Sequence, residues 1–234
     1  MRRDGEELRQ RCERLRCFDR DFDREAWSRG LLAGVDEAGV GPLAGPVVAA
    51  AVILPADFDL PEVFDSKQMR PAARQRCERD IRARALALGV ASVSPRRIDR
   101  VHILHAMLQA QRRALAALDL VPVAVIVDGC RTPSLPSAWG ATRLQAVVRA
   151  DSQSLAVAAA SVVAKETRDR IMLRLDRRYP EYGFARHKGY GTAAHKAALR
   201  RHGPSPVHRL CFCTWLETEA AAARQGVFEF APDA

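Results

Sequence analysis

The 234-residue sequence has no hydrophobic run long enough to cross a bilayer. Its longest apolar runs, residues 47–54 and 155–164, fall far short of the roughly 18 residues that a transmembrane helix needs. The N-terminal residues also lack the apolar core of a signal peptide. We therefore expect a cytoplasmic protein.

Paired cysteine patterns and several common catalytic motifs are also missing. The six cysteines form no CxxC pair and no Cys/His spacing of a zinc site, so free thiols are expected. The sequence contains no GxxxxGK[ST] loop, no GxSxG turn and no HExxH helix. These absences argue against a P-loop nucleotidase, an α/β-hydrolase and a zinc peptidase.

What is present is an ordinary globular composition with an uneven positive charge. Hydrophobic residues make up 48% and charged residues 28% of the chain, which has a net charge of +9. Residues 165–209 carry twelve Lys and Arg against four acids, and four of the six histidines. This segment indicates either a surface for a polyanion or a solvated charged face.

The apolar periodicity predicts an α/β fold with a mixed sheet flanked by helices. Residues 31–35 and 46–54 form a predicted hairpin, followed by a helix near 73–85, a strand at 90–94 and a helix from Pro95 to Asp119. Two further strands, 123–127 and 144–148, precede a helix over 152–178 with Asp151 as its N-cap. We divide the chain into a charged, helical extension (1–30), one catalytic domain (31–209) and a C-terminal tail (210–234).

Four carboxylates interrupt or end the predicted strands: Asp36, Glu37, Asp128 and Asp151. Taken singly, each fits a turn, a cap or an exposed strand end. Taken together, they can converge beyond the carboxyl ends of the strands, where ligands bind in open α/β sheets. Converging carboxylates need neutralisation, which hard divalent cations supply.

Six segments carry a resemblance to a known family: GVDEAGVGPLAGPVVAAAVIL (34–54), FDSKQM (64–69), VDG (127–129), ADSQSLAVAAASVVAKETRDRIM (150–172), YGFARHKGYGTAAH (182–195) and GPSPVHR (203–209). In this order they resemble ribonuclease HII, the bacterial type 2 ribonuclease H. The resemblance implies a ribonuclease H-like fold with a helical C-terminal region, and hydrolysis on the 5′ side of ribonucleotides. The implied substrates are RNA-DNA hybrids and single ribonucleotides embedded in duplex DNA.

The resemblance also implies the site. Asp36, Glu37, Asp128 and Asp151 would bind Mg²⁺ or Mn²⁺, with two ions in the active complex. Asp36 would bridge the ions, Asp151 would complete the site for the attacking water, and Glu37 and Asp128 would face the leaving oxygen. The ribose would be read by the turn Gly39, Val40 and Gly41 and by Tyr190.

Further substrate contacts are expected with less support from the pattern. Ser66 and Lys67 match a family segment near the site, and the candidates for backbone phosphate contacts are Lys165, His187, Lys188, His195 and Arg209. Solvent exposure alone is the alternative for each.

The sequence departs from the family pattern at a few positions. Val40 replaces the turn arginine, which puts the strength of substrate binding in question. Cys130 replaces an asparagine, where a small buried thiol is expected and sensitivity to oxidation is the alternative. Residues 225–230 resemble the peptides that dock on sliding clamps, although a flexible or self-packed tail is the favoured alternative.

Two other functions remain open. The first is a ribonuclease HIII-like nuclease, but 30 residues are too few for the N-terminal domain of that enzyme. The second is a non-catalytic nucleic-acid-binding relative, against which the intact carboxylates argue. We expect a monomer.

Overall fold

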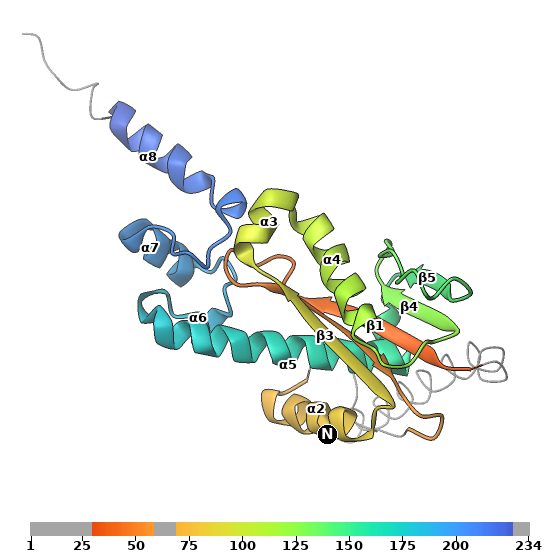
Figure 1. Cartoon of the computed structure of the whole chain (residues 1–234). Helices are drawn as coiled ribbons and strands as arrows, with labels where there is room; N and C mark the ends of the chain where they lie inside the picture. The colour runs from red at the N-terminus through yellow and green to blue at the C-terminus, as the bar shows by residue number, and fades with distance from the viewer. Residues whose placement is uncertain (1–29, 59–68, 227–234) are drawn as a thin grey trace, which may run out of the picture.

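The computed structural model describes residues 30–58 and 69–226. A five-stranded sheet in the order β3-β2-β1-β4-β5 forms its centre (Figure 1). The strands are β1 (Leu32–Ala38), β2 (Val47–Ile53), β3 (Ala87–Val93), β4 (Ala124–Asp128) and β5 (Arg143–Val147). Strand β2 is antiparallel to β1 and β3, whereas β4 is parallel to β1 and β5. The predicted mixed sheet is therefore confirmed.

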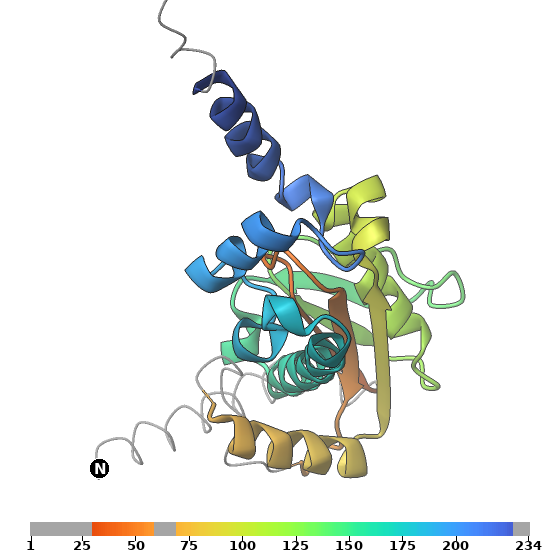
Figure 2. The ribbon, with the colours of Figure 1, turned by 90° about the vertical axis from the view of Figure 1, so that its left-hand side faces the viewer.

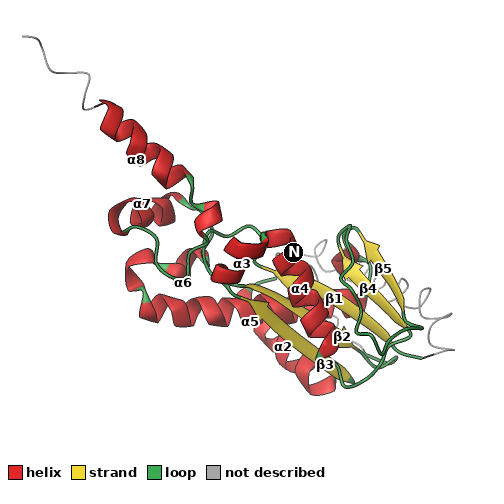
Figure 3. Cartoon of the chain, turned by 45° about the horizontal axis from the view of Figure 1, so that its top comes forward, coloured by secondary structure: helices red, strands yellow, loops and turns green. Residues whose placement is uncertain are grey.

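Helices cover both faces of this sheet (Figure 3). Helices α5 (Leu155–Arg178) and α2 (Pro71–Arg84) lie on one face, and α3 (Pro95–Val101) and α4 (Ile103–Ala116) lie on the other. In β2, Ala50 and Val52 pack toward α5, while Ala49, Ala51 and Ile53 pack toward α4. Both faces of β2 are buried, which explains why its sequence is a continuous apolar run.

Close packing brings the start of α5 against β1. A Cβ atom on Gly34 would lie 2.2 Å from the main-chain carbon of Ala156, so only glycine allows this approach. The small residues at the start of α5 serve the same purpose. As a result, α5 begins beside the end of β1 where Asp36 lies.

Two details of the predicted helices are wrong. The single helix from Pro95 to Asp119 is broken at His102, whose φ of 67° ends α3 and redirects the chain into α4. The N-cap of α5 is Ser154, whose hydroxyl accepts from the Val157 N–H at 3.3 Å. Asp151 lies instead in a short 3-10 turn, η1 (Ala150–Ser152), so its carboxylate is not used as the helix cap.

The C-terminal region is helical, as expected. It comprises η2 (Pro180–Tyr182), α6 (Phe184–His187), α7 (Ala193–His202), η3 (Leu210–Phe212) and α8 (Trp215–Gly226). Helix α8 points away from the sheet (Figure 2). No helix in the described part of the chain has the length and apolarity needed to cross a membrane. The predicted N-terminal extension lies outside the described residues, and the division into three parts stays a prediction.

Candidate active site

The alternation of side chains along β1 separates its two acids. Asp36 is buried on the α5 side, where the Ser161 side chain bonds to it. Glu37 points to the α4 side, where Nε2 of Gln111 donates to its Oε2 at 2.8 Å. The two carboxylates therefore lie on opposite faces of the sheet, and each is oriented by a different helix.

The other two acids lie on the neighbouring strand and on the turn before α5. Strand β4 runs parallel to β1, with Val127 opposite Val35, so Asp128 lies beside Asp36. Oδ1 of Asp128 accepts from the Ala150 N–H at 2.7 Å, which links β4 to the residue before Asp151. Asp151 is buried. Asp36, Glu37 and Asp128 thus lie together at the edge of the sheet formed by the carboxyl ends of β1 and β4, and Asp151 directly follows the residue whose N–H bonds to Asp128.

The electrostatics at this edge favour a bound cation. Burial raises the pKa of Asp36 well above its usual range, and the charges of Glu37 and Asp128 raise it further. A divalent cation would relieve this repulsion, and carboxylate oxygens are the ligands that Mg²⁺ and Mn²⁺ prefer. Among residues 30–58 and 69–226, no three acids, histidines or cysteines already form a metal-ligand cluster. The hydrogen bonds from Gln111 and Ala150 hold two of the carboxylates in this arrangement.

Hydrogen bonds from a buried arginine fix the main chain of the turn after β1. Arg209 is fully buried and donates to the carbonyl oxygens of Gly39, Val40 and Gly45 at 2.6, 2.8 and 3.0 Å. Burial and the nearby Arg168 charge lower its pKa to about 9. Arg209 therefore supports the turn, and its expected role as a phosphate contact is not supported, because its guanidinium is engaged inside the protein.

Arg168 on α5 holds the other end of this turn. Its guanidinium donates to the carbonyls of Pro46, Ala44 and Lys188 at 3.0 to 3.1 Å. A Cβ atom on Gly39, whose φ is +93°, would lie 2.0 Å from Arg168 Nε, so glycine is required there. Gly41 has open space around it and carries no such requirement.

Tyr190 lies on the loop that flanks this turn. The Leu43 N–H donates to the Gly189 carbonyl at 2.9 Å, which joins the turn to the loop. The Tyr190 side chain is 48% exposed and that of Val40 is 37% exposed. Both are exposed, and the bond between Leu43 and Gly189 places the loop that carries Tyr190 beside the turn that carries Val40.

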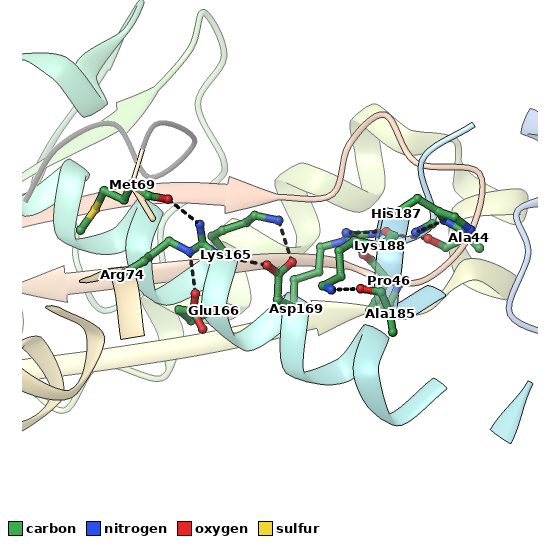
Figure 4. Close-up of polar contacts among 12 residues, drawn as sticks. Ala44, Pro46, Met69, Arg74, Lys165, Glu166, Asp169, Ala185, His187 and Lys188 are labelled. Carbon is green, nitrogen blue, oxygen red and sulfur yellow. Dashed lines mark hydrogen bonds and ion pairs between the residues drawn. The ribbon is translucent and has the colours of Figure 1, made fainter. Parts of the chain in front are cut away.

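The two lysines that are predicted to contact phosphate have partners within the protein. Nζ of Lys165 lies 2.6 Å from Asp169, which also pairs with Arg74, and Nζ of Lys188 donates to the Ala185 carbonyl (Figure 4). Both lysines are half-buried, and their contact with phosphate stays a prediction.

Further expectations concern five single residues. His195 is fully buried, so it does not face a phosphate, whereas His187 is half-buried. Ser66 and Lys67 lie outside the described residues. Cys130 is an exposed free thiol, so the expected buried thiol is wrong.

Three residues of this region were not predicted from the sequence: Ser161, Gln111 and Arg168. Ser161 lies among the small residues of α5, where nothing local distinguishes it. Gln111 is fully buried on the core face of α4, and a polar residue within that apolar stripe was the available signal. Arg168 lies among charged residues at the end of an apolar helix segment, and nothing local distinguishes it from a surface arginine.

Solved structures share this architecture. The ribonuclease H2 of Pyrococcus horikoshii OT3 is 26% identical with a TM-score of 0.67, and the match covers 81% of this chain and 98% of that one. The ribonuclease HII in a PCNA complex from Archaeoglobus fulgidus is 26% identical with a TM-score of 0.62, over 76% and 93% of the two chains.

Sequence comparison agrees. The ribonuclease HII of Geobacter sulfurreducens is 50% identical over 194 residues, which is 82% of this chain and 87% of the relative. The family model for ribonuclease HII matches residues 33–215, a span that includes all four carboxylates, the turn and Tyr190. The chain therefore belongs to the ribonuclease HII family.

Proposed function

We propose that this protein hydrolyses the phosphodiester on the 5′ side of a ribonucleotide, in RNA-DNA hybrids and at single ribonucleotides within duplex DNA. Membership of the family makes it a hydrolytic nuclease of the ribonuclease H class. The observation that supports the finer proposal is the proximity of Asp36, Glu37 and Asp128 at the ends of β1 and β4, with Asp151 next to the residue that bonds to Asp128. The products would be a 3′-hydroxyl and a 5′-phosphate.

The four carboxylates fit a site for Mg²⁺ or Mn²⁺, with two ions in the active complex. When bound, such cations would lower the pKa of the attacking water and stabilise the charge that develops on the phosphate. The chain's own contribution is orientation: Ser161 bonds to Asp36, Gln111 donates to Glu37, and the Ala150 N–H donates to Asp128. Partners of this kind tune metal affinity by about 10- to 100-fold in other proteins.

Selection of a ribonucleotide requires contact with the 2′-hydroxyl, the group that distinguishes RNA from DNA. Main-chain groups of the turn Gly39, Val40 and Gly41 would make this contact. Arg209 donates to two carbonyls of this turn and so holds its main chain in one position. Tyr190 would pack its exposed ring on the neighbouring deoxyribose. Main-chain recognition tolerates Val40, since every residue has the same main-chain groups.

The duplex would lie over the basic segment 165–209. Its twelve Lys and Arg, set against four acids, supply attraction for phosphates without sequence selection. Lys165 and Lys188 would reach phosphates by exchanging their present partners, Asp169 and the Ala185 carbonyl. An enzyme with this substrate would act in the cytoplasm.

A sliding clamp is a proposed partner of the C-terminal tail. The A. fulgidus structure is a complex of a ribonuclease HII with PCNA, and residues 225–230 of this chain resemble clamp-docking peptides. Deletion of residues 224–234 should abolish clamp binding and leave cleavage of short duplexes unchanged. Equal clamp binding by the truncated protein would contradict this contact.

The test of the proposed function is cleavage of duplex DNA that contains one ribonucleotide, with Mg²⁺ or Mn²⁺, and with EDTA as control. We expect a single metal-dependent cut on the 5′ side of the ribonucleotide. Cleavage of continuous hybrids alone would favour the ribonuclease HIII-like alternative. Binding without a cut in either ion would favour a non-catalytic role.

A further inference from the structure

Two buried histidines are linked by hydrogen bonds to the main chain of Tyr190. His195, on α7, and His208 are almost without solvent exposure, and their Nε2 atoms are 3.0 Å apart. Nδ1 of His195 lies 2.9 Å from the carbonyl oxygen of Tyr190. Nδ1 of His208 accepts from the main-chain N–H of Ser205 at 2.9 Å, and the Ser205 hydroxyl lies 2.8 Å from the same atom. These contacts form one continuous hydrogen-bonded chain from Ser205 to Tyr190.

The two ends of this chain determine the position of every proton in it. The Tyr190 carbonyl can only accept, so His195 carries its proton on Nδ1. The Ser205 N–H can only donate, so Nδ1 of His208 is unprotonated. A neutral imidazole has one N–H, and His208 therefore carries its proton on Nε2 and donates it to the bare Nε2 of His195. The two rings hold opposite tautomers.

The surroundings keep both rings neutral. The ring of His187 stacks on His195 at 4.4 Å between centroids, and Tyr182 and Phe184 pack against His208 at 4.7 and 5.5 Å. A second proton on either ring would place two donors face to face. In agreement, burial lowers the pKa of both histidines, that of His208 to about 4.

This series of hydrogen bonds ends at the main chain of Tyr190, which two further hydrogen bonds also fix. The Tyr190 N–H donates to the His187 carbonyl at 2.9 Å, and the Tyr190 carbonyl also accepts from the Thr192 N–H at 2.8 Å. The donation from His195 completes this set. The Tyr190 ring is left exposed on a fixed main chain, which is how a residue that reads a ligand is held in place.

We propose that His195 and His208 are positioning residues that fix Tyr190 and so set the preference for a ribonucleotide-DNA junction over a continuous hybrid. This inference rests on the proposed function, in which the Tyr190 ring packs on the deoxyribose. Neither histidine touches the substrate. Their effect on the ring passes through the hydrogen bond from His195 to the Tyr190 carbonyl.

The first experiment compares two substitutions of His195. Asn can place its amide N–H where Nδ1–H was, whereas Leu fills the space without a donor. His195→Leu should lower the ratio of kcat/KM on a single-ribonucleotide duplex to that on a continuous hybrid by about tenfold, the effect of one hydrogen bond. His195→Asn should restore most of that ratio. His202→Leu, at the exposed end of α7, is the matched control and should keep the wild-type ratio.

A double-mutant cycle separates positioning from general packing. In a Tyr190→Ala background, His195→Leu should leave the ratio unchanged, because the ring through which it acts is absent. An equal drop in both backgrounds would overturn the inference. So would a His195→Leu protein with the wild-type ratio.

The second experiment needs neither a variant nor activity. Long-range ¹H–¹⁵N NMR of the wild-type protein at neutral pH should find one buried ring protonated on Nδ1 and the other on Nε2. Finding both rings in the same tautomer would refute the proposed series of hydrogen bonds from Ser205 to Tyr190. A wild-type protein that cleaves neither substrate would instead contradict the proposed function, and the NMR result would still decide whether the histidines are arranged as described.

Discussion

Replacing Arg209 by methionine should affect the 39–46 turn more than the stability of the fold. Arg209 donates three hydrogen bonds to main-chain carbonyls of the turn. Bonds from a charged donor contribute about 1.5 to 3 kcal/mol each, or about 5 to 9 kcal/mol for the three. Against this, the pKa of Arg209 falls to about 9, chiefly through burial, which corresponds to a cost of roughly 5 kcal/mol for keeping the charge inside.

These two contributions partly cancel. The free energy of unfolding of Arg209→Met should therefore fall by only about 0 to 4 kcal/mol. The turn, however, loses all three donors that fix its carbonyls. A displaced turn should lower kcat/KM on a ribonucleotide-containing duplex by about 10- to 100-fold. Arg209→Lys should be intermediate, because one ammonium cannot span three carbonyls.

Urea unfolding and steady-state kinetics measure the two effects separately. Arg200→Met is the matched control, since Arg200 is exposed, pairs with Glu219 and has no contact with the turn. It removes the same charge and should leave both quantities close to wild type. A folded Arg209→Met enzyme with wild-type kcat/KM would refute this reasoning.

Three further predictions concern the turn and the histidines. Val40→Arg should tighten substrate binding and increase the salt dependence of the affinity by up to about one phosphate contact, and an unchanged slope would mean that position 40 faces away from the substrate. Gly39→Ala should destabilise the fold, by about 1 to 2 kcal/mol from its positive φ alone, whereas Gly41→Ala should leave urea unfolding unchanged; equal effects would be inconsistent with the geometry. Because the pKa of His208 is lowered from 6.5 to about 4, the unfolded state binds a proton that the folded state refuses as the pH falls between these values. Wild-type stability should thus decline over this range by up to about 3 kcal/mol more than that of His208→Asn, and parallel pH profiles would argue against the assignment.

The sheet and its acids could be predicted because their signals are local. Apolar runs such as residues 47–54 identify buried strands, and an acid at the end of such a run stands out. The break between α3 and α4 had no local signal, since His102 adopts a positive φ that sequence rarely indicates for a non-glycine residue.

The buried arginines could not be predicted for a different reason. Arg209 is 164 residues away from Gly45 in sequence, and it is buried only because the turn brings carbonyls to it. Arg168 depends in the same way on Ala44 and Pro46. A basic segment therefore predicts attraction for a polyanion, but not which of its residues face it.

We propose that the carboxylates at the ends of β1 and β4 and before α5 perform the cleavage. The most direct measurement is single-turnover cleavage of a duplex with one ribonucleotide by Asp36→Asn and Asp151→Asn at saturating metal, with duplex affinity measured in parallel. We predict that cleavage falls by about 10³-fold or more while most of the affinity remains, because phosphate contacts elsewhere supply it. Cleavage near the wild-type rate by either variant would contradict the account.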